Sequence, residues 1–393
     1  MLLTPGQTYS QLIKNYTHFQ KAFAAAKDSY DKGRFFHSYQ VLKKARSVKG
    51  FFQANEALSL HRELSKQLRR GGLEAIWERL NLIDTTSAKF CSENRVALSQ
   101  GRLWTLLDYR GPRTEEIASG MMRAPILGVH RLATPDANFF FTLDRKGTML
   151  RLDAETGREV ARHQLAPASS VRFFRENVYL VDEEGLKLWD LSESKPGGSI
   201  PLPPAATREL FPLAEGRLVV NSPKGAEVYN LRQGKSEGVL QVRLPQEPAG
   251  GVTFVNESED RRVLFSGYAD GTFAISDPRS GKVFFSQNYE TGPVTGVAIN
   301  MQVAFGLVVS STGKLVVFDL TNGQIIERTT AHPGAITHLQ VTEDGRYLTT
   351  RTIDGSFRLW ELSWALTDST SPLSIDWLPS GLFNKLGSFF KPR

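Results

Sequence analysis

Cysteine is almost absent from this sequence of 393 residues, which has only Cys91. One thiol allows no disulfide within the chain and no metal centre held by cysteine ligands alone. This usage is typical of a reducing compartment, so we expect a cytoplasmic protein. The first residues, MLLTPGQTYSQLIK, lack the basic and apolar regions of a secretory signal, and no apolar run approaches the roughly 18 residues of a transmembrane helix.

Catalytic motifs are lacking too. We identify no nucleophile elbow of the G-x-S-x-G type, no H-E-x-x-H and no G-x-G-x-x-G. The Gly-Lys-Ser run at Gly234 has Tyr229 where a phosphate-binding loop needs glycine, and it sits in a strand connection. The seven histidines form no pair at metal-ligand spacing. We therefore expect no catalytic residue, no metal and no cofactor.

Positive charge is concentrated at the N-terminus. The chain carries a net charge of +7, but residues 1–83 alone hold 14 Lys/Arg and 6 Asp/Glu, which leaves the remainder at −1. One interpretation is a solvated helical surface. The other is a patch for an acidic partner or an anionic surface.

Helical periodicity covers residues 8–68. Apolar residues recur at spacings of three and four on both sides of Gly33: Phe19, Ala22, Phe23 and Ala26, then Phe35, Tyr39, Leu42 and Ala45. This pattern predicts two antiparallel helices, which resemble a tetratricopeptide hairpin. ANEALSLHRELSKQL predicts a third helix with Asn55 as its N-cap and Arg70-Gly71-Gly72 as its end.

Beyond Gly72 a short pattern recurs seven times, at steps of 37 to 47 residues. Each copy is a turn glycine followed by an apolar strand that closes on an acid or asparagine: GRLWTLLD, GTMLRLD, GLKLWD, GAEVYN, GTFAISD, GKLVVFD and GSFRLWE. This period predicts a mainly β fold, a seven-bladed β-propeller over residues 72–366, preceded by a small α-helical hairpin region over 1–71. WALTDSTSP after Glu361 reads as a turn, so the last blade lacks an outer strand. We predict that residues 72–83 return to supply it and close the ring.

The last repeat resembles the WD-repeat family. His332, Thr350, Asp354 and Trp360 stand at the family's four tetrad positions, and Trp189-Asp190 keeps its signature dipeptide. The resemblance implies a hydrogen-bonded structural tetrad, which is not catalytic. The helical leader, GGLEAIWERL and the ending LWELSW also resemble a group of bacterial multidomain signalling proteins, which implies a bacterial setting.

The tail, residues 367–393, is amphipathic. It concentrates apolar side chains near three cations, and those proposed to bind a partner are Trp377, Leu378, Leu382, Phe383, Leu386, Phe389 and Phe390. A tail this apolar is expected to fold back onto the protein, to dock into a partner's groove or to contact a membrane surface.

These patterns favour a non-catalytic scaffold or adaptor that binds protein partners. Candidate contacts on exposed turns are Arg145-Lys146, Glu183-Glu184, Arg232 and Arg279. One alternative is an enzyme or ligand-binding propeller with a central-channel site, whose residues would come from separate blades. The other is nucleic-acid binding by the basic leader, where KNYTHFQK mixes cations with aromatics; we favour it less because Phe35, Tyr39 and Leu42 are expected in the core.

Overall fold

The computed structural model divides the chain into two compact units. The helical unit contains the chain up to Ile76 and the residues from Leu362 onward in the last strand, and the propeller unit runs from Trp77 to Glu361. The described residues are 5–92, 94–111, 113–133, 138–182, 185–192, 195–200, 210–213, 216–222, 225–231, 233–246, 248–258, 263–300 and 304–368. The partner-binding residues predicted in the tail therefore lie outside the described residues.

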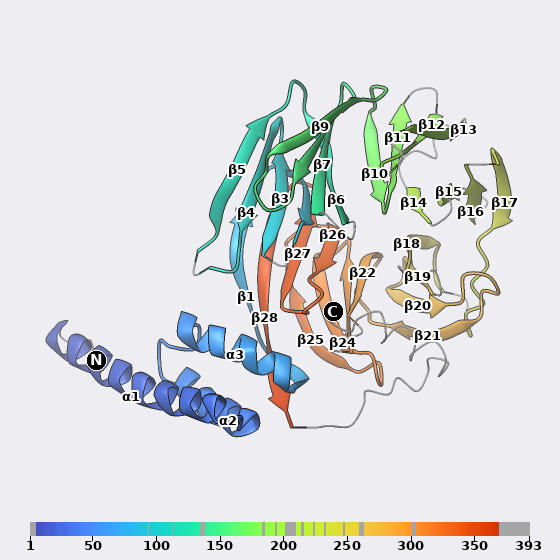
Figure 1. Ribbon diagram of the computed structural model, residues 1–393. Coiled ribbons are helices and arrows are strands. Elements are labelled where there is room, and N and C mark those ends of the chain that lie inside the picture. The colour runs from blue at the N-terminus through green and yellow to red at the C-terminus, as the bar shows by residue number, and fades with distance from the viewer. Residues whose placement is uncertain are drawn as a thin grey trace. The chain divides into compact units, whose positions relative to one another are not determined.

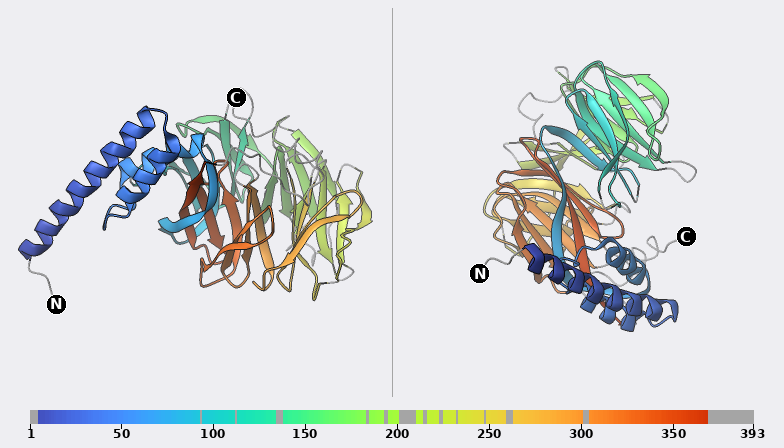
Figure 2. Two further views of the ribbon diagram at one scale, coloured as in Figure 1. Left: turned by 90° about the horizontal axis from the view of Figure 1, so that it is seen from below. Right: turned by 90° about the vertical axis from the view of Figure 1, so that its left-hand side faces the viewer.

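Three helices make up most of the helical unit: α1 (Pro5–Asp31), α2 (Phe35–Arg46) and α3 (Asn55–Gln67). The turn between α1 and α2 needs Gly33, whose φ of +71° favours a residue without a Cβ, and its amide donates to the carbonyl of Tyr30. α1 and α2 lie side by side (Figure 2). None of the helices in the described part of the chain is both long and apolar enough to cross a membrane.

Two details of the predicted third helix are wrong. Ala54, not Asn55, is the N-cap, without a side-chain cap bond, because a backbone turn from Phe51 to Ala54 leads the chain directly into the helix. Arg70-Gly71-Gly72 does not end the helix but lies in strand β1 (Arg69–Leu82). Pairing with a neighbouring strand decides the conformation there, and Gly71 lies close to Thr367.

The core of the helical unit follows the predicted apolar face. Phe19, Ala26, Tyr39, Leu42 and Ala45 are buried in one cluster, which α3 completes with Ala57, Leu60 and Leu64. The ring of Phe19 stacks on Phe51 with 4.6 Å between centroids. The expectation that Tyr39 and Leu42 belong to a core is therefore confirmed.

Seven four-stranded antiparallel sheets form the propeller (Figure 1), as the repeat predicts. The first three sheets are β2 (Thr85–Phe90), β3 (Arg95–Gln100), β4 (Leu103–Asp108), β5 (Glu115–Met121); β6 (Ile126–Ala133), β7 (Asn138–Asp144), β8 (Thr148–Asp153), β9 (Glu159–Gln164); and β10 (Ser170–Phe174), β11 (Asn177–Asp182), β12 (Gly185–Asp190), β13 (Lys195–Ile200). The next three are β14 (Leu210–Pro212), β15 (Arg217–Ser222), β16 (Gly225–Asn230), β17 (Lys235–Val239); β18 (Val252–Glu257), β19 (Leu264–Tyr268), β20 (Thr272–Ser276), β21 (Val283–Asn288); and β22 (Val294–Asn300), β23 (Phe305–Ser310), β24 (Lys314–Asp319), β25 (Ile325–Thr330).

The seventh sheet closes the ring with both ends of the chain. Its order is β1-β28-β27-β26, with β26 (Ile336–Val341), β27 (Tyr347–Thr352) and β28 (Phe357–Thr367). The predicted closing strand is thereby confirmed, although it begins at Arg69 and ends at Leu82. An N-terminal strand thus completes the C-terminal blade as its outer strand and pairs with the side of β28 that β27 leaves open.

The turn predicted after Glu361 is wrong, because β28 continues to Thr367. Its extension is held by the helical unit: the Nε2 atom of His61 lies 3.0 Å from the carbonyl oxygen of Trp364, and Arg46 Nη2 donates to Ser363 Oγ at 2.9 Å. Trp364 and Leu366 are both buried. These contacts come from residues some 300 positions earlier, which local turn chemistry cannot reveal.

Candidate functional site

The described residues contain no group of three or more His, Cys, Asp or Glu side chains placed to hold a metal ion. Cys91 is fully buried, and burial raises the pKa of its thiol to about 12, so it stays protonated at neutral pH.

One sequence match differs from the expectation above. The pentapeptide from Gly234 to Gly238 does have the G-x-S-x-G spacing of a nucleophile elbow. An elbow must place its serine on a sharp turn between a strand and a helix. Ser236 instead lies exposed in β17, the last strand of its sheet. The spacing therefore carries no catalytic geometry.

The structure brings together three of the four tetrad residues. Thr350 Oγ1 lies 2.7 Å from His332 Nε2 and accepts a hydrogen bond from Trp360 Nε1 at 2.9 Å. A threonine hydroxyl can donate one hydrogen bond and accept two, so either the hydroxyl or the imidazole can be the donor in the contact with His332. Burial favours the neutral imidazole, since it lowers the pKa of His332 to about 4.

Asp354 departs from the family's arrangement. Its Oδ1 accepts from the hydroxyl of Thr352 and from the backbone amide of Ser356, and these bonds lower the pKa of its carboxyl. His332 Nδ1 lies 3.4 Å from Ser356 Oγ. Serine and threonine hydroxyls thus stand between the aspartate and the histidine, and the structural role of the cluster stays a prediction.

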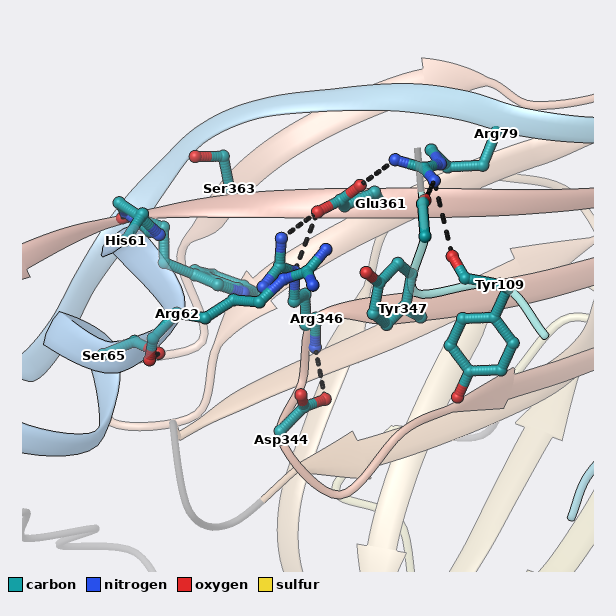
Figure 3. Close-up of polar contacts among 12 residues, drawn as sticks. His61, Arg62, Ser65, Arg79, Tyr109, Asp344, Arg346, Tyr347, Glu361 and Ser363 are labelled. Atoms are coloured by element: carbon teal, nitrogen blue, oxygen red, sulfur yellow. Dashed lines mark hydrogen bonds and ion pairs between the residues drawn. The ribbon is translucent and has the colours of Figure 1, made fainter. Parts of the chain in front are cut away.

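A buried ion cluster forms where the ring closes (Figure 3). Glu361 on β28 is fully buried; its Oε1 accepts from Arg346 Nε at 2.8 Å, and its Oε2 lies 3.0 Å from Arg79 Nη1. Arg79 comes from the closing strand β1 and also donates to the carbonyls of Tyr109, at 3.4 Å, and Gly111. We call Glu361, Arg346 and Arg79 the closure cluster. It ties β1, the last blade and the first blade together, a role that the sequence analysis did not assign.

The exposed-turn residues are scattered. Arg145-Lys146 lies exposed between β7 and β8, and Arg279 is exposed after β20. Glu183-Glu184 and Arg232 fall outside the described residues.

A contiguous apolar surface occurs instead on α1. Four large side chains are at least half exposed: Tyr9 (68%), Leu12 (56%), Ile13 (50%) and Tyr16 (54%). Their spacing places them on one helix face, which continues C-terminally into the buried Phe19. We call Tyr9, Leu12, Ile13 and Tyr16 the α1 stripe.

Helix length explains why α2 does not cover the stripe. α1 has 27 residues and α2 has 12, which at 1.5 Å per residue gives about 40 Å against about 18 Å. The N-terminal turns of α1 extend beyond α2 (Figure 2). Phe51, which packs against the buried part of this face, reaches only the last residue of the stripe: its ring centroid lies 6.1 Å from that of Tyr16. The sequence shows the spacing of the stripe, but only the helix bounds show that α2 does not extend over it in the described part of the chain.

Two comparisons with known proteins concern the propeller. Residues 174–366 match the family model described as outer membrane protein assembly factor BamB. The chain is also similar to the U3 small nucleolar RNA-associated protein 21 homolog of Schizosaccharomyces pombe, with 25% identity over 160 residues. That alignment covers 40% of this chain and 17% of the relative. The protein is thus a seven-bladed β-propeller with a WD-repeat-like relative.

Proposed function

We propose that the protein is a non-catalytic scaffold whose helical unit binds a protein partner through the α1 stripe. One observation carries this proposal: four adjacent large apolar side chains near the N-terminal end of α1 are at least half exposed. Towards the C-terminal end of α1, the same helix face is buried in the core of the helical unit. Exposed apolar surface of this contiguity is typical of interaction sites.

The spacing of the stripe favours a helical partner. Positions i, i+3, i+4 and i+7 are the anchors of helix-in-groove recognition and of helix–helix packing. The face is continuous with the contacts that α1 already makes to α2, so a partner helix would extend an existing helical layer. Tetratricopeptide-like hairpins bury their faces by stacking in this way, which supports that interpretation of the leader.

Charge favours an acidic partner. Between Tyr9 and Lys27, α1 carries Lys14, Lys21 and Lys27 and no carboxylate. Lys14 lies alongside the stripe and Lys21 about 7.5 Å beyond Tyr16 along the helix axis, so both are within about one Debye length of the stripe, roughly 8 Å at physiological ionic strength. An amphipathic helix with Asp or Glu beside its apolar face fits this surface.

The propeller serves in this proposal as a rigid platform. Each sheet packs on its neighbours, so exposed turns such as those at Arg145-Lys146 and Arg279 can vary without disturbing the core. The BamB-like and WD-repeat-like likenesses support protein partners. We further propose a cytoplasmic multiprotein assembly in a bacterium, which rests on the resemblance of the leader and GGLEAIWERL.

The test compares two double variants of equal added charge. Leu12→Glu/Ile13→Glu places two carboxylates in the stripe, whereas Gln11→Glu/His18→Glu places two on exposed polar positions of the opposite face of the same helix. Tagged chains are used to recover partners from the native host, and the partner's affinity is then measured with purified proteins. We expect the control to bind as the natural chain does and the stripe variant to lose at least about tenfold, because buried apolar anchors dominate such interfaces.

Equal recovery by the two variants would contradict the proposal, provided that both keep the circular dichroism and melting temperature of the natural chain. So would stripe-dependent binding to RNA or to anionic vesicles without any protein partner, which would assign the basic leader to nucleic acid or to a membrane surface instead.

A further inference from the structure

Three turns of the first two blades lie next to one another. They are the turn between β3 and β4 at Arg102, the connection from β5 to β6 at Arg123, and the turn between β7 and β8 at Arg145-Lys146. The amide of Met122 donates to the carbonyl of Arg102 at 2.9 Å. The amide of Arg145 donates to the carbonyl of Pro125 at 3.0 Å. Backbone hydrogen bonds thus fix the three turns side by side.

Each of these turns carries an exposed cation, and one carries two. We call Arg102, Arg123, Arg145 and Lys146 the turn patch, and all four side chains are exposed. Because consecutive Cα atoms are 3.8 Å apart, the bond from Met122 places the Cα atoms of Arg102 and Arg123 within about 11 Å of each other. Among the residues that the structure describes, no side chain forms an ion pair or a hydrogen bond with any of the four cationic groups.

Two carboxylates lie on the turns at this end of the first two blades, and neither pairs with the turn patch. Asp144 is fully buried, and its Oδ1 accepts hydrogen bonds from the amides of Lys146 and Thr148. Asp84 is exposed on the turn before β2. Four cations against two carboxylates leave a net charge of +2. Like charges that gather without partners repel one another in the free chain, and an acidic partner would remove that repulsion.

One large apolar side chain, that of Met121, lies among these cations and is 63% exposed. It ends β5 opposite Leu103, which follows Arg102, and it precedes Arg123 by two residues. Arginine and methionine are enriched in protein interfaces, whereas lysine is depleted there. Methionine also adapts to partners of different shape, because it is unbranched and polarizable. Three arginines around one exposed methionine therefore resemble a protein-binding surface more than a solvated face.

Two other kinds of anionic partner fit this surface less well. None of the three turns carries an aromatic side chain on which a nucleic-acid base could stack. A membrane surface is held by apolar area together with charge, and Met121 supplies little such area. At the same end of the fifth and seventh blades, the turns expose Glu290 and Asp354, which would repel a polyanion that crosses the propeller.

We infer that the turn patch binds an acidic segment of a protein partner, in which Asp or Glu side chains flank one apolar residue. The guanidinium groups of Arg102, Arg123 and Arg145 present paired N–H donors that match carboxylates. The apolar residue of the segment contacts Met121. This surface belongs to the propeller unit, so it gives the scaffold a second binding site besides the α1 stripe.

The test uses the full chain and a fluorescent heptapeptide with six Asp or Glu residues around a central leucine. Anisotropy measures its affinity at low and at physiological ionic strength. Arg102→Gln/Arg145→Gln should weaken binding at least about tenfold, because charge-assisted hydrogen bonds are lost. The control Arg113→Gln/Arg158→Gln removes the same charge from exposed turns at the other end of the same blades, and it should change affinity by less than about twofold because solvent screens distant charges.

A second arm tests the apolar contact. Met121→Ser should weaken binding of the leucine peptide several-fold, since an interface anchor is lost. The same variant should not affect a peptide with serine in place of leucine. Equal losses for the two peptides would show that Met121 does not contact the apolar residue.

The inference is overturned if the heptapeptide does not bind saturably, or if both arginine double variants lose affinity equally, which would assign binding to net charge alone. It is also overturned if a single-stranded oligonucleotide or anionic vesicles bind more tightly than the peptide through the same arginines. Leu12→Glu/Ile13→Glu should leave peptide binding unchanged. If that variant abolished it, the peptide would bind the helical unit and the turn patch would not be its site.

Discussion

Removing the carboxylate of Glu361 should destabilise the propeller far more than removing an exposed one. Glu361 is fully buried, and Arg346 and Arg79 beside it have only about a tenth of their side-chain surface exposed. Truncation to alanine leaves two guanidinium groups in a buried site without their counter-charge. Breaking a buried pair from one side costs about 3–5 kcal/mol, so we expect Glu361→Ala to lower the free energy of unfolding by that amount.

The matched control is Glu63→Ala in α3. Glu63 also forms a close ion pair, with 2.8 Å to Lys66 Nζ, but the two side chains are 47% and 65% exposed. Solvent screens such pairs, which contribute about 0.2–0.5 kcal/mol. The two variants therefore separate burial from the mere presence of an ion pair.

Urea unfolding followed by tryptophan fluorescence measures both variants. Glu361→Gln keeps the volume and one acceptor, and it should lie between the natural chain and the alanine variant. If Glu361→Ala unfolded at the same urea concentration as Glu63→Ala, the closure cluster would contribute nothing to the ring, and the reasoning would be refuted.

Three further predictions concern the tetrad, a close glycine contact and ring closure. The pKa of His332 is about 4 in the folded chain against 6.5 when unfolded, so below pH 6.5 the unfolded chain binds a proton that the folded chain does not bind. Between pH 7 and 4.5 we expect this difference to lower the free energy of unfolding by about 2–3 kcal/mol. In unfolding measured against pH, His332→Gln should reduce this loss, and equal losses in both proteins would contradict the prediction. A Cβ on Gly313 would lie 2.0 Å from the carbonyl oxygen of His332, whereas one on Gly234, also at positive φ, meets nothing within 4 Å. Gly313→Ala should therefore lower the free energy of unfolding by well over the about 1 kcal/mol expected for Gly234→Ala, and thermal unfolding of both variants measures the difference. Similar values would show that the backbone at Gly313 shifts to accommodate the Cβ. A chain that begins at Thr85 lacks β1 and should lose its sharp calorimetric transition, so an unchanged transition would argue against closure by this strand.

Much of the propeller could be predicted because its information is local. Each blade repeats a turn glycine and an apolar strand, and the closing position at Asp108, Asp153 or Asp319 ends the third strand of its sheet in the structure. The ring-closing strand was predictable from an edge that needed a partner. The continuation of β28 to Thr367 was not, because its partners His61 and Arg46 come from the other end of the sequence.

The candidate site was less accessible from sequence. The tetrad positions carry a family pattern, and the structure places His332, Thr350 and Trp360 within hydrogen-bond distance. Whether an apolar helix face is covered depends on the length of its neighbour, and the period of α1 does not encode where α2 stops. The ion pair of Arg79 and Glu361 joins residues 282 positions apart, and only closure of the ring brings them together.

Hydrogen exchange on the full chain, with and without its purified partner, tests the scaffold proposal most directly. The account predicts that the partner slows amide exchange in the N-terminal turns of α1, around Leu12 and Ile13, and that the slowing disappears in Leu12→Glu/Ile13→Glu but persists in Gln11→Glu/His18→Glu. Protection confined to the propeller, with α1 exchanging as it does alone, would contradict it.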